Sequence, residues 1–321
     1  MTETAGYAVN FLSVLTMAVT LLPLSTSTHW AVRMWEFPRF QIICVGIVLL
    51  GIALTKGQQV MAVSLAMCVV YQLTWIYPYT FLARPEVRIA QPNPGLDVSL
   101  LSANVEQGNS EFHLIADIIA REKPDVLFLM ETDRTWIEAL EPVLAGFQTV
   151  TTEPKDNYYG MVFATNLTAR KVRYAYLSND DTPALLAELE DREGNGFRFI
   201  GLHPRPPVPG TSTEDRDEQL KKTARFGRAA DVPLVVMGDF NDPVWSRTSS
   251  KFARIGEYRD PRKGRGFVSS FHAGYWFLRF PIDHFFVSEM VDVSRFRRLE
   301  NIGSDHFPLQ AKVRVRSNDK K

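Results

Sequence analysis

Polar side chains that could do chemistry recur at the ends of apolar segments in the last two thirds of the chain. Near the C-terminus, the stretch GSDHFPL (303–309) places an Asp and a His side by side before one such segment. Earlier segments end in carboxylate, amide or imidazole groups, and the full set is Asn104, Glu106, Glu131, His203, Asp239, Asn241, Asp283, Asp305 and His306. If the segments are aligned strands, these groups share one sheet edge, where rigid strand ends meet open loops.

These residue types together indicate phosphate-ester chemistry. Carboxylate and amide oxygens are hard ligands that suit Mg²⁺ or Mn²⁺ better than zinc. Histidines beside carboxylates can act as a general acid and a general base, or hold the charge of a phosphate. A divalent metal would neutralise charge on the phosphoryl oxygens while a carboxylate or a His activates water. Each motif alone is typical of a turn or a cap, so the prediction depends on their joint occurrence.

The elements that must position these groups alternate between strand-like and helix-like stretches. Apolar runs predict strands at 97–105, 124–131, 159–165, 197–203, 232–240, 284–289 and 308–315. Apolar spacing and capping residues predict helices at 112–122 and 211–228. Interleaving of this kind predicts an α/β domain.

Six motifs in this order resemble the endonuclease/exonuclease/phosphatase superfamily, which has the DNase-I-like fold. They are LSANVEQGN, PDVLFLMET, GLHPRPP, VVMGDFND, PIDHFFVS and GSDHFPL, and the resemblance covers roughly residues 96–316. It implies a four-layer α/β/β/α sandwich, with two mixed sheets packed face to face between helices. It also implies Mg²⁺-dependent hydrolysis of phosphodiesters or phosphomonoesters.

The resemblance implies a metal site and assigns its ligands. Glu131 would be the principal ligand of Mg²⁺, or of Mn²⁺, helped by Asn104 and Asp305. Glu106 would lie nearby or bind through water. Many relatives have Asp or Asn at the position of Glu106, which leaves its direct role open.

The resemblance also assigns catalytic roles to five residues. Asp239 would orient or deprotonate the attacking water, and Asn241 would hold a phosphoryl oxygen. His306 would contact the scissile phosphate. Asp283 would orient His203, which would lie against the phosphate or protonate the leaving oxygen. Some relatives use Tyr at the position of His203.

The first quarter of the chain is apolar and predicts a membrane region at 1–88 with about three transmembrane helices. Uncharged apolar runs occupy 5–24, 40–55 and 58–83, and a spanning helix needs roughly 20 apolar residues. A cleaved signal peptide fits poorly, because the N-terminus MTETAG has no basic region and two more apolar runs follow. A buried helical core is the other alternative.

Proline, glycine and charged residues indicate how the rest of the chain is organised. Proline and glycine predict a linker at 89–96, before a catalytic domain at 97–316 and a charged tail at 317–321. With three spans, the loop 25–39 and the catalytic domain lie on one side of the membrane. That side holds Arg33, Arg39, Arg84 and Arg88, and the other holds only Lys56, so the Lys/Arg bias favours an integral membrane protein with a cytoplasmic catalytic domain.

Composition restricts the chemistry without naming a substrate. The two cysteines, Cys44 and Cys68, lie in apolar runs, so no disulfide framework and no cysteine metal site are predicted. Charges balance at 36 basic and 36 acidic residues over the chain. The part after residue 88 carries 31 and 33, which disfavours strong nonspecific binding to DNA.

The predicted function is a membrane-anchored, Mg²⁺-dependent phosphoesterase that hydrolyses a phosphodiester. Nucleic acid is one candidate substrate, because 247–266 is rich in basic residues and Trp245 and Trp276 flank it as possible stacking surfaces. A solvated loop explains the same stretch. A lipid head group is the second candidate, because the anchor would hold the site near the bilayer. A non-catalytic, membrane-anchored binding module is the alternative to an enzyme.

Overall fold

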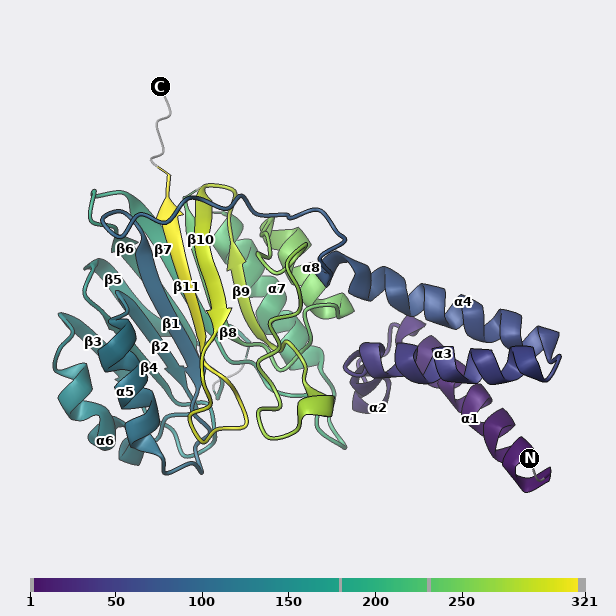
Figure 1. Ribbon diagram of the computed structural model, residues 1–321. Coiled ribbons are helices and arrows are strands. Elements are labelled where there is room, and N and C mark those ends of the chain that lie inside the picture. The colour runs from purple at the N-terminus through teal and green to yellow at the C-terminus, as the bar shows by residue number, and fades with distance from the viewer. Residues whose placement is uncertain (1–2, 179–180, 230–231, 317–321) are drawn as a thin grey trace.

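The computed structural model of the chain describes residues 3–178, 181–229 and 232–316. The charged tail predicted at 317–321 lies outside the described residues. Two mixed sheets form the centre of the larger part of the molecule (Figure 1). The first sheet has the strand order β10-β11-β1-β2-β4-β3, and its strands are β1 (Val98–Asn104), β2 (Val126–Met130), β3 (Thr149–Glu153), β4 (Met161–Thr165), β10 (Val291–Arg298) and β11 (Leu309–Val315).

The second sheet has five strands in the order β5-β6-β7-β8-β9. They are β5 (Thr168–Ala175), β6 (Ala184–Glu190), β7 (Gly196–Leu202), β8 (Leu234–Asp239) and β9 (Asp283–Val287). Among the strand pairs of the described residues, β1–β2 and β7–β8 are parallel and the other seven are antiparallel. Each sheet therefore has one parallel pair of strands near its centre, and both members of that pair end at the same edge.

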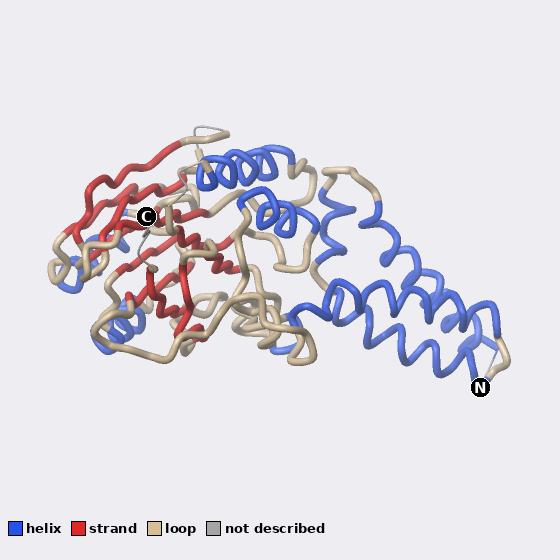
Figure 2. The backbone as a smooth tube through the Cα atoms, turned by 90° about the horizontal axis from the view of Figure 1, so that it is seen from above, coloured by secondary structure: helices blue, strands red, loops and turns tan. Residues whose placement is uncertain are grey.

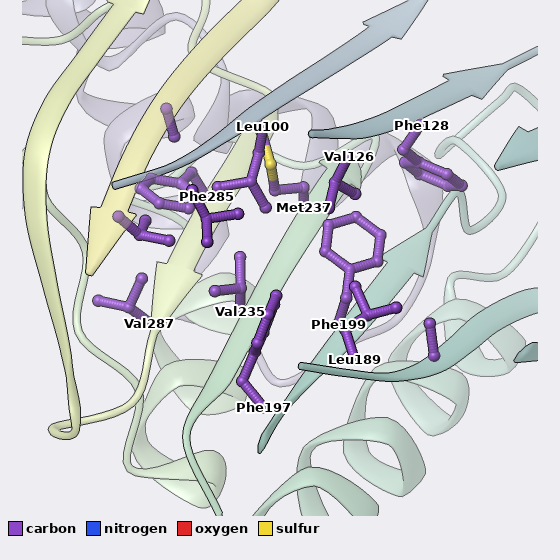
Figure 3. Close-up of a cluster of buried hydrophobic side chains, with 14 of the residues drawn as sticks. Leu100, Val126, Phe128, Leu189, Phe197, Phe199, Val235, Met237, Phe285 and Val287 are labelled. Atoms are coloured by element: carbon purple, nitrogen blue, oxygen red, sulfur yellow. The ribbon is translucent and has the colours of Figure 1, made fainter. Parts of the chain in front are cut away.

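The main apolar core lies between the two sheets. Leu100, Val126 and Phe128 from the first sheet meet Phe199 and Met237 from the second (Figure 3). All residues of β1, β2 and β8 are buried, because helices cover the outer faces of both sheets. A strand covered on both faces reads as a continuous apolar run, which is why these strands could be predicted from the sequence.

Helices complete the four layers. On the first sheet they are α5 (Phe112–Glu122) and α6 (Arg134–Leu144), and on the second α7 (Glu214–Arg228) and α8 (Arg247–Gly256). The inward face of α5 carries Ile115, Ile118 and Ile119 at helical spacing. The predicted α/β/β/α sandwich is confirmed.

Several elements were not predicted, namely β3, β5, β6, β10, α6 and α8. The seven predicted strands all occur, as β1, β2, β4, β7, β8, β9 and β11, with ends that differ by no more than two residues. The predicted helix 211–228 begins at Glu214 instead, because residues before it bond to the N-terminal region. The Thr213 amide donates to the carbonyl oxygen of Thr28 at 2.9 Å, and Ser212 pairs with His29 across a β-bridge.

The N-terminal helices extend away from the sandwich as a separate bundle (Figures 1 and 2). They are α1 (Glu3–Leu21), α2 (Trp30–Arg33), α3 (Arg39–Thr55) and α4 (Gln59–Ile76), with short 3₁₀ turns at η1 (Leu22–Leu24), η2 (Met34–Glu36) and η3 (Tyr77–Tyr79). Within the described residues, the helical stretches 3–24 and 59–79 are long and apolar enough to cross a membrane. Residues 30–36 and 39–55 make a third candidate if this pair, bent by 74°, is one span.

Both apolar and polar groups line the inside of this bundle, and many apolar groups face outward. The Arg39 guanidinium donates to Gln72 Oε1 at 2.8 Å, and Gln72 Nε2 donates to Thr20 Oγ1 at 3.3 Å. Val48 and Val60, by contrast, are exposed, Val60 at 83 %. Apolar side chains this exposed do not fit a helical core that protein covers on all sides. Inward polar groups and outward apolar ones are typical of membrane helices.

The bundle and the sandwich meet at a shared apolar cluster. The helices contribute Ile43, Val69, Ile76 and Tyr79, and the sandwich contributes Val244, Trp245, Phe280 and Ile282. Trp245 is buried, and its indole N–H donates to the carbonyl oxygen of Glu36 at 2.8 Å. The expectation that Trp245 offers a stacking surface for bases is therefore wrong.

Candidate active site

The candidate residues gather at one edge of the sandwich because of strand direction. β1, β2, β7 and β8 end there, and β9 and β11 begin there because each runs antiparallel to its central neighbour. The register makes this explicit, since Asp239 at the end of β8 pairs with Asp283 at the start of β9. β11 ends at the upper edge in Figure 1, toward the label C, so the site lies at the opposite, lower edge.

Gly238 allows β8 to reach the site. Its φ is +143°, and a Cβ atom there would collide with the carbonyl oxygen of Leu202 at the end of β7. Only glycine permits such a close approach of two backbones. The contact sets Asp239 beside His203, the residues that follow Gly238 and Leu202.

Asn104 joins the two sheets through its side-chain amide. Its Nδ2 donates to Glu131 Oε1 at 2.8 Å and to Asp239 Oδ2 at 3.1 Å. The Gln107 amide donates to the other oxygen of Glu131 at 3.3 Å. Burial raises the pKa of Glu131, so a nearby cation would favour its charged form.

His306 lies between two buried carboxylates. Its Nδ1 donates to Asp283 Oδ2 at 2.7 Å, and its Nε2 is 3.5 Å from Asp239 Oδ2. Burial alone would lower the pKa of His306, but Asp283 and Asp239 outweigh it and raise that pKa to about 10. Burial, together with the charge of Asp283, raises the pKa of Asp239 to about 6 against the opposing effect of His306. His306 is therefore a cation at neutral pH and Asp239 is largely an anion.

The predicted pairing of Asp283 with His203 is wrong, because Asp283 holds His306. In the order β7-β8-β9, strand β8 separates His203 at the end of β7 from Asp283 on β9. His203 Nε2 instead lies 3.7 Å from both Glu131 Oε1 and Asp239 Oδ2. Burial lowers the pKa of His203, so this imidazole is neutral at neutral pH.

Asp305 sits on a turn that hydrogen bonds fix on both sides. Its amide donates to Glu106 Oε2 at 3.0 Å, and its carbonyl oxygen accepts from the Ala273 amide at 2.6 Å. The Ser304 hydroxyl donates to the carbonyl oxygen of Asn104 at 2.9 Å. The Asp305 side chain is 33 % exposed, more than the other carboxylates of the site. Glu106 thus holds the turn of Asp305 through its side chain.

Asn241 is bonded to both neighbouring loops. Its backbone, at φ +50°, donates to Asp239 Oδ1 at 2.7 Å, and its Nδ2 donates to the Pro204 carbonyl at 3.0 Å. Its own carbonyl oxygen accepts from Arg216 at 3.2 Å. The structure therefore places Asn241 beside the segment that carries His203, and all eight predicted site residues lie at one edge.

Two ligand sets at this edge could hold a divalent cation. Asp239, Asp283 and His306 have ligand atoms within 4.8 Å of one another. In that set the imidazole already bonds Asp283, so a metal ion would have to displace the proton of a strongly basic group. Glu131 and Asp305 offer only oxygen atoms, and Asp305 is open to solvent. The second set fits a hard cation better.

Sequence reasoning missed two aromatic walls of the site. The ring of Tyr159 lies 5.4 Å from that of His203, and the ring of Phe271 lies 4.9 Å from that of His306. Tyr159 precedes Gly160, where a Cβ atom would collide with the Thr132 carbonyl next to Glu131, but this constraint is visible only in the structure. The local sequence marks neither aromatic residue as part of the site.

The basic stretch 247–266 is largely engaged in the fold. Arg262 is fully buried, pairs with Asp260 at 2.9 Å, and donates to the Asp283 carbonyl at 2.8 Å. Four more of its cations bond to carboxylates or carbonyls, namely Arg247, Arg259, Lys263 and Arg265. Arg205 likewise pairs with Asp181 at 2.6 Å. Most of the basic residues of 247–266 therefore form bonds within the fold.

Comparison with known proteins agrees with this fold. A profile of the Endonuclease/Exonuclease/phosphatase family matches residues 101–306, more than half of the chain. The chain belongs to this family, whose members are phosphoesterases and nucleases that typically use a divalent metal. No curated protein matches the chain closely enough to count as a relative.

Solved structures of low sequence identity share the fold. D. rerio TDP2, solved with a single-strand DNA product, is 14 % identical with a TM-score of 0.57, covering 68 % of this chain and 99 % of that chain. The human Nocturnin catalytic domain, solved with a sulfate anion, is 19 % identical with a TM-score of 0.57, covering 72 % and 100 %. The mannosyl-6-phosphatase of Bacteroides thetaiotaomicron VPI-5482 is 18 % identical with a TM-score of 0.52, covering 67 % and 99 %.

Proposed function

We propose that this chain is a membrane-anchored, Mg²⁺-dependent phosphoesterase that hydrolyses a phosphodiester. The observation that carries the proposal is the buried His306–Asp283 pair beside Asp239, with Glu131 at the same edge. This combination provides a fixed cation for a phosphoryl oxygen, a carboxylate for water and an acidic metal site. A binding module without activity would have no use for all three.

Glu131, Asp305 and Asn104 would hold Mg²⁺, or Mn²⁺, in this proposal. When bound, the cation supplies positive charge against the phosphoryl oxygens and helps to align the ester. The Asn104 amide nitrogen faces Glu131. Its Oδ1 accepts from the Glu106 amide at 3.0 Å, so Asn104 positions the carboxylates and needs its oxygen turned toward the site to act as a ligand itself.

Asp239 and His306 would divide the chemistry at phosphorus between them. The Asp239 carboxylate would orient the attacking water and accept its proton, and its raised pKa makes it a better base than an ordinary Asp. His306 would hold a phosphoryl oxygen with the positive charge that Asp283 maintains. A preformed charge of this kind stabilises the transition state without reorganisation.

His203 and Asn241 would contact the ester from the second sheet. A neutral His203 donates a hydrogen bond from one ring nitrogen, so we assign it to a phosphoryl oxygen or to the leaving oxygen. Asn241 would hold another phosphoryl oxygen, as its position between Asp239 and the Pro204 carbonyl allows.

The N-terminal bundle would anchor the enzyme in a membrane through helices α1, α3 and α4. Residues 25–38 contact the sandwich, as in the bond from Arg247 to the Ser25 carbonyl at 2.8 Å. This segment and the catalytic domain would therefore share one side, with the turn at Lys56 on the other. The Lys/Arg bias then favours a cytoplasmic catalytic domain.

Hydrolysis by the full chain in detergent micelles tests the proposal. Bis(p-nitrophenyl) phosphate serves as the diester and p-nitrophenyl phosphate as the monoester, each with Mg²⁺ and with EDTA. We expect Mg²⁺-dependent cleavage of the diester that Asp239→Ala and His306→Ala both abolish. Asp117→Ala and His113→Ala on the exposed face of α5 are matched controls that should keep full activity. Turnover that survives EDTA or both site variants would contradict the proposal.

A further inference from the structure

Residues 271–280 form a hairpin with an exposed aromatic tip, which we call the aromatic hairpin. Phe271 and Phe280 pair across its base. Its tip contains the 3₁₀ turn η4 (Trp276–Leu278), preceded by Tyr275. These four apolar residues are all exposed, and Trp276 reaches 78 %. The described part of the sandwich leaves them uncovered, so the tip needs another partner to be shielded from water.

The base of the aromatic hairpin is a wall of the active site. Phe271 forms a β-bridge with His306, and their rings are 4.9 Å apart. The Ala273 amide donates to the Asp305 carbonyl at 2.6 Å. A partner that covers the tip therefore lies close to the reacting groups, because the short hairpin joins the tip to the wall of the site.

The aromatic hairpin also touches the membrane helices where they leave the sandwich. Gln41 in the first turn of α3 donates to the Phe277 carbonyl at 2.8 Å. Phe37, just before α3, packs edge to face on Phe280 at 5.7 Å. The tip thus lies level with the end of the helix that would enter the bilayer. In Figure 1, η4 is the short yellow-green helix at the lower right of the sandwich, and it faces α2.

Other exposed apolar residues continue this surface around the same end of the bundle. Phe81 and Leu82, which follow η3, are 81 % and 83 % exposed, and a Cβ at Gly266 would touch the Phe81 ring. Phe40 of α3 is half exposed and lies 5.9 Å from the ring of Phe267. Aromatic rings at the ends of membrane helices favour the headgroup region of a bilayer.

Two arginines beside the site have no acidic partner. Arg279 and Arg298 stack on the ring of Phe307, the residue after His306, at 5.1 and 4.2 Å. Each guanidinium donates to one backbone carbonyl, and within the described residues neither forms an ion pair. Guanidinium groups bind phosphates well, so the rim between the site and the aromatic tip suits a layer of phosphate groups.

We propose that the aromatic hairpin lies in the headgroup region of the bilayer that holds α1, α3 and α4, and that the site acts on a phosphodiester carried by a membrane lipid. This inference rests on the proposed function and gives it a substrate class. Nucleic acid fits less well, since the basic stretch 247–266 is largely paired within the fold and Trp245 is buried. The exposed aromatic tip and the neighbouring apolar helices of the N-terminal bundle favour lipid as the partner that covers the tip.

The position of the tip can be measured without any turnover. The full chain, with Cys44→Ser and Cys68→Ser, carries Trp276→Cys labelled with an environment-sensitive fluorophore, in nanodiscs of mixed phosphatidylcholine and phosphatidylglycerol. Val150→Cys on the edge strand β3, an exposed apolar position on another side of the sandwich, is the matched control. We expect headgroup-level spin-labelled lipids to quench the label at 276 at least about fivefold more than at 150. Equal quenching would overturn the proposal and leave water, a second copy or another protein as the occupant.

The substrate class is tested by comparing a dissolved ester with bilayer lipids. The probes are bis(p-nitrophenyl) phosphate and nanodiscs that contain phosphatidylcholine, phosphatidylethanolamine, phosphatidylglycerol and sphingomyelin, with single-stranded DNA as the competing substrate. Replacing Trp276 and Phe277 by Ser should lower lipid hydrolysis about tenfold or more. The same variant, like Val150→Ser, should hydrolyse the dissolved ester at the wild-type rate.

The outcomes separate the two proposals. No Mg²⁺-dependent turnover of the dissolved ester would refute the proposed function, while the quenching result would still decide where the hairpin lies. Turnover of the dissolved ester without release of any headgroup from the four lipids would overturn the lipid substrate. Cleavage of single-stranded DNA that the tip variant leaves unchanged would overturn it as well.

Discussion

The charge of His306 depends on two neighbouring carboxylates. Asp283 accepts from its Nδ1 at 2.7 Å, and Asp239 lies 3.5 Å from its Nε2. Because the two carboxylates raise the pKa of His306 to about 10 against the effect of burial, the imidazolium is present throughout the neutral range and is lost only as pH rises through 10. The pair therefore works as a fixed positive charge.

Asp283→Asn should turn this fixed charge into a titrating one. Without the Asp283 carboxylate the pKa of His306 falls, so the imidazolium is lost at a lower pH and the alkaline limb of the pH–rate profile moves toward neutrality. We expect kcat to fall about 100-fold or more at pH 8. The measurement is the pH dependence of diester hydrolysis by the full chain in micelles.

Asp292→Asn is the matched control for this change. Asp292 is also buried on a strand, but it pairs with Arg316 at 3.8 Å and lies away from the site. It should keep the wild-type pH profile. If Asp283→Asn lowered the rate equally at all pH values, Asp283 would act only by positioning the ring.

Glu131→Gln should separate metal binding from folding. The amide keeps the shape of the side chain and its one oxygen can still accept from Asn104 or from Gln107, but it removes the negative charge. We expect the affinity for Mn²⁺ to fall about 10-fold to 100-fold, measured by electron paramagnetic resonance on the full chain. Glu141→Gln on the outer face of α6 should bind Mn²⁺ as the wild type does. If Glu131→Gln bound Mn²⁺ as tightly as the wild type, the metal site would instead be assigned to Asp239, Asp283 and His306.

The chemistry of the site residues could be predicted from sequence, but their pairing could not. All eight predicted residues lie at or just beyond a strand end at the same edge, because a polar residue after an apolar run marks the end of a buried strand. The pairing of Asp283 with His306 depends on the spatial order of β7, β8 and β9. That order is set by long-range contacts, which have no signature in the local sequence.

At the scale of single elements, the β7–β8 pair depends on Gly238. Gly238→Ala adds a Cβ that collides with the Leu202 carbonyl and forces a φ of +143° on an L-residue. We expect the free energy of unfolding to fall by about 3 kcal/mol, measured by pulse proteolysis of the full chain in micelles. Asp239 and His203 should also move apart, so activity should fall together with stability.

Gly194→Ala separates the two causes of this loss. Gly194 has a φ of +83°, but a Cβ there would have nothing within 4 Å. Gly194→Ala should therefore lower the free energy of unfolding only by the cost of the backbone conformation, about 1 kcal/mol. A loss as large as that of Gly238→Ala would show that φ, and not the contact with Leu202, is responsible.

Five of the seven strands predicted from the sequence are buried along their whole length. β1, β2, β4, β8 and β9 are buried throughout and read as apolar runs. β3 (TVTTE) has no buried residue, and β5 alternates exposed and half-buried residues with several charges. These edge strands take their conformation from their neighbours, so their own sequences carry little signal.

At the scale of the whole molecule, the helical bundle is part of the structure that supports the active site. Glu36, between the helices, is buried, and its side chain pairs with Arg33 at 3.3 Å and accepts from the Arg247 amide at 3.1 Å. Arg33 in turn donates to Thr248, which bonds Asp217 at 3.2 Å. From Asp217, Arg216 reaches the carbonyl of Asn241.

The sandwich without its helices should therefore not behave as an independent soluble domain. A fragment that starts at residue 90 loses Ile43, Val69, Ile76 and Tyr79, the helical half of the cluster that covers Trp245, Phe280 and Ile282. It also lacks Arg33, so the chain of bonds from Arg33 through Thr248 to Asp217 is broken. We expect this fragment to self-associate and to bind a hydrophobic dye several-fold more strongly than the full chain in micelles.

Size-exclusion chromatography and dye fluorescence check this prediction, and a matched fragment sharpens it. Replacing Trp245 and Phe280 by Gln in the fragment removes much of the uncovered apolar surface and should restore a monomer, because the remaining sandwich core is separate from this cluster. The same two changes in the full chain should destabilise it, since there they lie against helices. A monomeric fragment with normal diester hydrolysis would show that the bundle anchors the enzyme and does nothing more for its fold.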